Sequence, residues 1–486
     1  MKHLNYFLAF LLLIITSACH TSKKDKAVQE EIKQPNIILI LADDMGFGDT
    51  KRYNHSSKIP TPNIDELARE GMRFTDAHTN SSVCTPTRYG IITGQYAWRS
   101  SLKKGVTWSY DSLIIPKKTK TIATVLKSKG YHTAAVGKWH LGLGWQKEQD
   151  SVLFDKPLTA GPTDLGFDYY YGIAASLDIP PYVYIENKKV TQVPNGYSEG
   201  NSKTYGGAFW RKGLVAPNFD HYNVLNHLTV TAEAKIKALS KEKAPFFMYF
   251  ALTAPHTPWI PKDEYKGKSE AGDYGDLMVE VDDVVGRINN LLKSLDIDDN
   301  TIVIFTSDNG SALSSDLIAK YQHDTNGPWR GRKGDIYEGG HRVPFIVKWP
   351  EKIIQNTQSN QLVSTTDFYA TFADIVNENT IQGTGSNRKD SQSFLPALLQ
   401  EKVPRNMRQS MVYHSVVGMF GLRDKDYVYI NGKGSGGFLE VPDTTHIKVP
   451  KQIYNLTQDA TESENLFVSH AKLAERFQIK LDSIIN

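Results

Sequence analysis

The chain has 486 residues, of which 40% are hydrophobic and 22% charged, and its formal net charge is +3 at pH 7. These values are typical of globular proteins and exclude a disordered or fibrous chain. Because 56 basic residues are nearly balanced by 53 acidic ones and form no basic block, nucleic acid is not expected as the main partner.

The first 34 residues have the features of an export signal followed by a tether. Lys2 gives a positive start, and residues 6–15 form an apolar run that is too short to span a bilayer. We expect a signal peptide over residues 1–18 and a flexible tether over residues 19–34. Cys19 follows small residues, as in a bacterial lipoprotein box, which predicts lipidation of its thiol; ordinary signal-peptidase cleavage is the alternative. The protein is then expected in the bacterial cell envelope, periplasmic or associated with the outer membrane, and in contact with a membrane only through its lipid.

Apolar runs and helical patterns alternate over residues 35–376. Buried strands are predicted over 36–42, 132–136, 244–254 and 301–307, and helices over 61–70, 121–129, 224–240 and 277–295. This alternation predicts an α/β fold with a large, mostly parallel sheet flanked by helices. In such a sheet the site lies beyond the carboxyl ends of the strands. The polar residues that follow strands there are Asp43, Asp44, His256, Asp308 and Asn309.

The pattern changes after about residue 376. Residues 378–393 are polar, short antiparallel strands are predicted over 410–413 and 427–430, and a terminal helix over 466–485. A smaller C-terminal α+β subdomain is therefore expected over residues 377–486. The Gly-rich stretch 431–437 lacks the strand–helix context of a phosphate-binding loop, so it is predicted to be a loop without a nucleotide role.

Two pairs of oxygen-bearing residues suggest a cation site. The adjacent carboxylates of Asp43 and Asp44 repel each other unless a cation or buried hydrogen bonds compensate, and a solvated turn is the alternative. Asp308 and Asn309 offer the hard oxygen ligands that calcium prefers. Apart from Cys19, Cys84 is the only cysteine, and a lone cysteine is either a small buried hydrophobic residue or a reactive group.

Several short motifs follow one another along the chain: 84–88 (CTPTR) with 93–94 (TG), 137–142 (GKWHLG), 255–259 (PHTPW), 331–334 (GRKG), 337–344 (YEGGHRVP), and 453–456 (IYNL) with 465–466 (NL). In this order they resemble the motifs of the type I sulfatases of the alkaline phosphatase superfamily, whose signature is C/S-x-P-x-R, followed after several residues by T-G. The resemblance extends from about residue 35 to the C-terminus.

The resemblance implies an alkaline phosphatase-like fold and a formylglycine nucleophile. In this family a maturation enzyme oxidises the cysteine, here Cys84, to formylglycine (3-oxoalanine), whose hydrate attacks sulfur. The resemblance also implies one calcium ion facing the modified Cys84. Relatives with two zinc ions commonly place histidine where this chain has Asn309, so calcium is favoured. The implied metal ligands are Asp43, Asp44, Asp308 and Asn309, together with Cys84.

The resemblance also assigns the basic residues. Arg88 would hold the nucleophile and the sulfate, and Lys138 and Lys333 would bind sulfate oxygens. His140 would take the proton when sulfate is expelled. His256 would bind sulfate or serve as the acid at the leaving oxygen, and Lys333 is the alternative acid. Asp308 is the expected base, and Ser176 a further polar contact to the substrate. Taken one at a time, each lysine or histidine is more often a surface or structural residue.

Export, the implied lipid anchor and an aromatic share of 11% fit an enzyme that acts on sulfated carbohydrates, such as algal galactans, ulvan or animal glycosaminoglycans. Residues 177–186 and 205–219 are predicted to line the specificity pocket, with ordinary loop packing as the alternative. Two other functions stay open at this point. One is a phosphomonoester or phosphonate hydrolase on the same fold, and the other is a non-catalytic lipoprotein that binds sulfated glycans.

Overall fold

The computed structural model describes residues 34–201, 207–377, 389–400, 407–438 and 449–486. The predicted signal peptide, Cys19 and all but the last residue of the predicted tether lie outside the described residues, as does most of the polar stretch 378–393. Among the described residues, no helix combines the length and the apolar character that crossing a membrane requires.

In the described part of the chain a ten-stranded sheet has the order β15-β2-β14-β13-β1-β12-β4-β7-β8-β9. Its centre is parallel throughout and consists of β13 (Thr301–Ser307), β1 (Asn36–Asp43), β12 (Phe246–Pro255), β4 (His132–Lys138) and β7 (Tyr169–Ile173). Beside β13 lie β14 (Phe345–Lys348), β2 (Met72–Phe74) and β15 (Thr357–Ser359), and beside β7 lie β8 (Ile185–Glu186) and β9 (Lys189–Val190). The predicted mostly parallel sheet is confirmed, and its antiparallel strands lie toward the edges.

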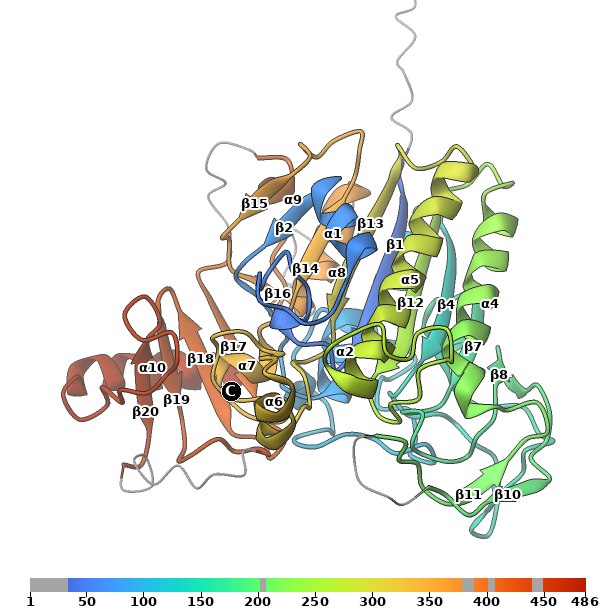
Figure 1. Cartoon of the computed structure of the whole chain (residues 1–486), viewed down its shortest axis with the longest axis horizontal. Coiled ribbons are helices and arrows are strands. Elements are labelled where there is room, and N and C mark those ends of the chain that lie inside the picture. Colours follow the sequence, from blue (N-terminus) through green and yellow to red (C-terminus); the bar gives the residue numbers. More distant parts are fainter. Residues whose placement is uncertain (1–33, 202–206, 378–388, 401–406, 439–448) are drawn as a thin grey trace, which may run out of the picture. The chain divides into compact units, whose positions relative to one another are not determined.

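Helices cover both faces of the sheet, which explains why its central strands are apolar along their whole length. In β1, alternate side chains enter two separate cores, because successive residues of a strand point to opposite faces. One core includes residues of α2 (Cys84–Thr93), α3 (Ile122–Ser128) and α8 (Phe368–Ile375). The other includes residues of α1 (Pro62–Arg69), α4 (Val224–Leu239) and α5 (Gly272–Ser294), which cross one face of the sheet in Figure 1.

The C-terminal part is a four-stranded antiparallel sheet packed on a helix (Figure 1). Its strands are β17 (Ser410–His414), β18 (Phe420–Asp424), β19 (Tyr427–Ile430) and β20 (Gln452–Asn455), and the helix is α10 (Ala471–Ile485). Phe477 and Leu481 of α10 are buried against Val412 and Tyr429 of the sheet. Shorter described elements are β3 (Ala77–His78), β5 (Lys147–Glu148), β6 (Ser151–Val152), β10 (Gly196–Ser198), β11 (Gly213–Val215), β16 (Val363–Ser364), α6 (Ser315–Tyr321), α7 (Glu338–His341) and α9 (Leu395–Leu398).

Some predicted boundaries need correction. Helix α5 begins at Gly272 rather than at residue 277, because its polar first turn hides the apolar period. Helix α10 begins at Ala471 rather than at residue 466, because the Leu466 backbone N–H donates to the Ile453 carbonyl oxygen of β20. Strands β18 and β20 were not predicted, since neither stands out as an apolar run. Helix α2 was also not predicted; Pro86 lies in its first turn, where no backbone N–H is needed.

Candidate active site

Most of the predicted site residues meet where the central parallel strands end. Asp43 is the last residue of β1 and pairs in register with Pro255, the last residue of β12. Lys138 ends β4, and Asp308 directly follows β13. The N-terminal end of α2, which begins at Cys84, reaches the same edge, because the Arg88 guanidinium contacts both Asp43 and Asp308.

Buried cations neutralise the Asp43 carboxylate. The Lys138 ammonium lies 2.9 and 2.7 Å from its two oxygens, and Arg88 Nη2 lies 3.7 Å from Oδ1. Burial alone raises the pKa of Asp43, but Lys138, His256 and Arg88 outweigh it and hold the pKa below its usual value. Asp43 is therefore an ionised carboxylate inside the protein.

Asp44 is held by a second lysine and by an amide. Lys333 Nζ donates to Oδ2 at 2.8 Å, and Asn309 Nδ2 donates to Oδ1 at 2.7 Å. A backbone φ of 66° places Asp44 in the left-handed region directly after β1. Burial raises the pKa of Asp44, but Lys333 and His256 lower it by more, so the pKa lies below its usual value and this carboxyl is also ionised.

Asp308 differs from the other two carboxyls. Arg88 binds its Oδ2 through Nε at 2.9 Å and Nη2 at 2.7 Å, and the Asp44 backbone N–H donates to Oδ1 at 3.2 Å. Burial and the neighbouring charge of Asp43 nevertheless raise the pKa of Asp308 above its usual value. Asp308 is thus the site carboxyl that accepts a proton most readily.

The oxygen atoms of this cluster fit a hard divalent cation. Asp43, Asp44, Cys84 and His256 each offer a ligand atom within 4.8 Å of the others. Asn309 Oδ1 is buried without a hydrogen-bond partner in the described part of the chain, which is costly unless a ligand satisfies it. Carboxylates combined with an amide oxygen are the donors that calcium prefers.

A second buried group, formed by His78, Glu338 and His341, also has three close ligand atoms. Here Glu338 already binds Arg342 Nε at 2.7 Å and Arg423 Nη1 at 3.4 Å. His78 Nδ1 and His341 Nδ1 lie 3.1 Å apart and face each other. Because its charge is matched by two guanidinium groups, this cluster has the character of a structural ion network rather than of a metal site.

Cys84 is a poor thiol nucleophile where it stands. It is 2% exposed, and burial raises the pKa of its thiol to about 11 in spite of Lys138 and Lys333. The thiolate is the reactive form of cysteine, so at neutral pH this side chain is almost entirely in its unreactive form. Charged groups of the site therefore surround a cysteine whose thiol has little reactivity of its own.

The two predicted histidines have defined tautomers. His140 Nε2 lies 2.8 Å from the Thr107 carbonyl oxygen, which can only accept, so Nε2 carries the hydrogen. Its Nδ1 is buried without a partner in the described residues, and burial, Lys138 and Arg88 hold the pKa of His140 well below its usual value. His256 has the opposite arrangement: Nδ1 donates to the Thr257 carbonyl oxygen at 2.7 Å, and Nε2 lies 3.7 Å from Asp44 Oδ2.

Comparison with known proteins identifies the family. Residues 35–378 match the family model Sulfatase, and residues 332–484 match the model N-sulphoglucosamine sulphohydrolase, C-terminal. The chain belongs to the sulfatase family. Membership in this family supports the sulfatase among the three functions that the sequence left open. The protein is a sulfuric ester hydrolase.

Similar sulfatases are known from bacteria and animals. The chain is 31% identical to an N-acetylgalactosamine-6-O-sulfatase of Bacteroides thetaiotaomicron, over 100% of this chain and 99% of that relative. It is also 31% identical to human N-acetylgalactosamine-6-sulfatase, over 76% of this chain and 66% of the relative. A solved Bacteroides thetaiotaomicron structure, described in terms of glycosaminoglycan metabolism, matches with a TM-score of 0.81 and 30% identity, covering 93% of this chain and 99% of that one.

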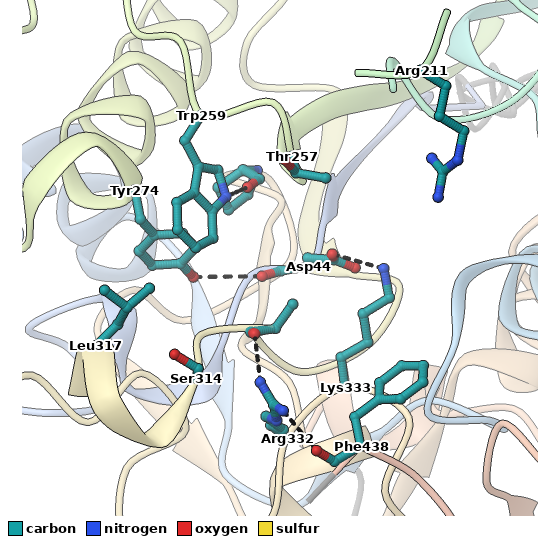
Figure 2. A pocket seen from close by; sticks show the side chains of 12 residues that line it. Asp44, Arg211, Thr257, Trp259, Tyr274, Ser314, Leu317, Arg332, Lys333 and Phe438 are labelled. Atoms are coloured by element: carbon teal, nitrogen blue, oxygen red, sulfur yellow. Dashed lines mark hydrogen bonds and ion pairs between the residues drawn. The ribbon is translucent and has the colours of Figure 1, made fainter. Parts of the chain in front are cut away.

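A cleft of about 610 Å³ opens onto Asp44 and Lys333 of this sulfatase (Figure 2). Trp259 and Tyr274, whose rings meet edge to face at 5.4 Å, lie on one side of it. Phe438 lies on the other side, next to Lys333. The cleft therefore combines a charged floor with aromatic walls.

Several cleft residues were not singled out in the sequence, although some signals were present. Arg211 lies in the predicted specificity stretch 205–219 and lines the cleft. Asp178, in the stretch 177–186, forms an ion pair with it. Nothing in the sequence pointed to Tyr274 or Phe438, because only the fold brings them to Asp44 and Lys333.

Ser176 stands apart from the other predicted residues. It is buried in the segment after β7, close to Ala174, whose carbonyl oxygen accepts from the His140 backbone N–H at 3.0 Å. In the described part of the sulfatase, no hydrogen bond joins the Ser176 hydroxyl to the other site residues, so the structure gives it a place near the site and no defined contact.

Proposed function

We propose that this sulfatase removes sulfate from sulfated oligosaccharides, with a formylglycine made from Cys84 as its nucleophile and one calcium ion as its cofactor. The observation that carries this proposal is the surrounding of Cys84. Three cations and three carboxylates enclose a thiol whose pKa of about 11 keeps it protonated. Such machinery is of little use to a protonated thiol, but it suits a modified side chain that carries hydroxyl groups.

Asp43, Asp44, Asp308 and Asn309 would hold the calcium ion, and the modified Cys84 would face it. The fit rests on the carboxylates and on Asn309 Oδ1, which has no hydrogen-bond partner within the described ranges of the chain. Calcium would supply positive charge to sulfate oxygens and to the attacking hydroxyl. The hydrated formylglycine would supply that hydroxyl, with a second one on the same carbon through which sulfate is later expelled.

The remaining roles belong to the chain's own residues. Arg88, Lys138 and Lys333 hold the anionic sulfate, and each such donor typically contributes about a hundred- to a thousandfold in rate. Asp308 is the base for the attacking hydroxyl, because burial and the charge of Asp43 raise its pKa.

The two histidines act at different ends of the reaction. His256 carries hydrogen on Nδ1, so its Nε2 is the atom that donates a proton to the leaving oxygen once the ring is protonated. The buried Nδ1 of His140 has no hydrogen-bond partner among the described residues, so its lone pair can accept the proton when sulfate is expelled. Ser176 would be a further polar contact to the substrate.

The substrate proposal follows from the cleft and from the relatives. Aromatic walls beside cationic side chains suit a sulfated sugar, whose ring has an apolar face and whose sulfate is anionic. The full-length bacterial relative is named for 6-O-sulfate on N-acetylgalactosamine, which favours that ester among sulfated polysaccharides. Algal galactans and ulvan are the competing sources.

We also propose how the protein is organised and matured. Residues 1–18 would direct export, Cys19 would be lipidated, residues 19–34 would tether the enzyme in the cell envelope, residues 35–376 would be catalytic, and residues 377–486 would form the C-terminal subdomain. A formylglycine-generating enzyme would be the maturation partner. Labelling with a fatty acid tests the anchor, because Cys19→Ser should abolish the label and release the protein from membranes.

The function is tested by sulfate release from a panel of desalted oligosaccharides. The panel contains N-acetylgalactosamine 6-sulfate, sulfated algal galactan fragments and ulvan fragments, each beside its phosphate analogue. We expect sulfate release from at least one sugar ester, highest for the 6-sulfate, and little phosphate release. Faster phosphate release, or turnover of no sugar sulfate by matured enzyme, would contradict the proposal.

A further inference from the structure

The Gly-rich loop 431–438 is tied to the segment that carries Lys333. The Ile336 backbone N–H donates to the Ser435 carbonyl oxygen at 2.8 Å. Arg332 Nη2 donates to the Phe438 carbonyl oxygen at 2.6 Å. The loop therefore lies directly against residues 332–336, although about a hundred residues separate the two in sequence.

The glycines of both segments allow this close approach. Gly334 has a φ of 89°, and a Cβ added there would meet the Phe438 ring at 2.5 Å. A Cβ on Gly437 would lie 2.4 Å from the backbone of Gly334. Since real Cβ atoms do not come so near, side chains at these positions would push the loop away from Lys333. The loop is thus built to bring Phe438 close to that lysine.

The Phe438 side chain is held in place and is about half exposed. It is 47% exposed and lines the cleft beside Lys333, with Trp259 across the cleft (Figure 2). A single exposed apolar ring is common on a protein surface and carries no meaning by itself. Phe438 differs from such isolated surface residues in two ways. Its backbone carbonyl is held by Arg332, and its ring packs on Gly334, which is next to the proposed sulfate-binding Lys333.

We propose that Phe438 is a specificity-determining residue whose ring stacks on the apolar face of the sugar that carries the scissile sulfate. Galacto-configured sugars present a row of C–H groups on one ring face, and an aromatic ring packs well against such a face. Trp259 lines the opposite wall, so the sugar lies between two aromatic side chains while Lys333 holds its sulfate. This inference rests on the proposed carbohydrate function and names the residue of the C-terminal part that reads the sugar.

The test compares full-length, matured enzymes on two probes that separate recognition of the sugar from that of the sulfate. KM and kcat are measured with N-acetylgalactosamine 6-sulfate, and inorganic sulfate is used as a competitive inhibitor. Phe438→Ala should raise KM about tenfold with kcat changed less than about twofold, and the inhibition constant of inorganic sulfate should stay unchanged. Phe438→Trp should restore KM, whereas Phe438→Leu should restore it only in part.

Val417→Ala removes an exposed apolar side chain of the same part of the chain outside the cleft lining, and it should leave all constants unchanged. An unchanged KM in Phe438→Ala would overturn the inference. So would a parallel rise in KM and in the inhibition constant of sulfate, because the ring would then merely support Lys333. If the wild-type enzyme is active on no sulfated sugar, the proposed function fails and this inference fails with it. If the wild-type enzyme is active but Phe438→Ala has an unchanged KM, only this inference fails.

Discussion

The Lys138 ammonium nitrogen lies 2.7 Å from Oδ2 of Asp43 and 2.9 Å from Oδ1, and both side chains are fully buried. With Arg88 on Asp308 and Lys333 on Asp44, every carboxylate of the site has a cationic partner inside the protein. The buried acids are therefore compensated by the chain itself, and an added divalent cation would give the site the excess positive charge that an anionic substrate needs.

Replacing Lys138 should damage both folding and activity. Lys138→Ala leaves Asp43 buried without its nearest cation and with only the more distant Arg88 and His256 beside it, so we expect a loss of about 3 kcal/mol in the free energy of unfolding without calcium. Added calcium should recover part of this loss, because it would replace the missing positive charge. Urea unfolding with and without calcium measures the effect. Lys127→Ala, which breaks an exposed ion pair with Asp168, is the control and should cost less than about 1 kcal/mol. Equal losses with and without calcium would contradict the charge balance.

Calcium should stabilise the wild-type protein through Asn309. A ligand present at a hundred times its Kd stabilises the folded state by about 2.7 kcal/mol, which appears as a higher Tm. Asn309→Ala removes an amide oxygen that no described residue hydrogen-bonds, and it should reduce this rise in Tm. Chelation should abolish activity in the wild type, and calcium should restore it. A larger Tm increase with zinc than with calcium would contradict the assigned ion.

Much of the fold could be predicted from the sequence, because buried parallel strands are continuous apolar runs. Strand β13 has the predicted bounds, and β1 exceeds its prediction only by Asp43. Helix α2 was not predicted. It begins at Cys84 and contains Pro86 in its first turn, where proline is tolerated.

The site was predictable only as far as its motifs reach. The stretches around Cys84, Lys138 and His256 could be selected as candidate site residues from their motifs, and the fold brings them together. The cleft walls did not. Phe438 meets Gly334 through the docking of a loop from the C-terminal sheet, and no pattern within either segment encodes that meeting. Contacts of this kind depend on tertiary packing rather than on local sequence.

His140 should be needed for turnover and not for binding. Burial keeps its ring neutral, and its Nδ1 lone pair has no partner among the described residues, so His140→Ala removes a proton acceptor. We expect kcat to fall about a hundred- to ten-thousandfold with little change in KM. If His140 acts in the expulsion of sulfate, the variant should release one equivalent of alcohol in a burst and retain sulfate, as seen by intact-protein mass spectrometry. His470→Ala, at an exposed histidine, is the control, and loss of the burst itself would place His140 in the earlier step.

Glu280 should make the protein less stable at high pH. Burial raises the pKa of this carboxyl from 4.5 to about 7. Since the folded state holds its proton more tightly than the unfolded chain, stability is full below about pH 4.5 and declines as the pH rises to about 7.

Glu280→Gln keeps an acceptor for the Lys262 backbone N–H and removes the titration. The free energy of unfolding of the variant should exceed that of the wild type by less than about 1 kcal/mol at pH 5 and by about 3 kcal/mol at pH 8, as measured by urea unfolding at both values. Glu264→Gln, at an exposed neighbour, should change neither value. A gain of equal size at pH 5 would show that burial of the charge is not the cause.

The identity of the side chain at position 84 decides the mechanism. Cys84→Ala should give a folded protein without sulfatase activity, because alanine is tolerated at the start of helix α2 but cannot be converted to formylglycine. Cys84→Ser should be active only in a host whose maturation enzyme accepts serine.

The most direct test is peptide mass spectrometry of the segment that contains Cys84, taken from wild-type enzyme coexpressed with a formylglycine-generating enzyme and assayed in the same preparation. We predict the mass of a side chain that has lost sulfur and gained an aldehyde oxygen, in proportion to the specific activity. Fully active enzyme with an intact thiol at Cys84 would contradict the account.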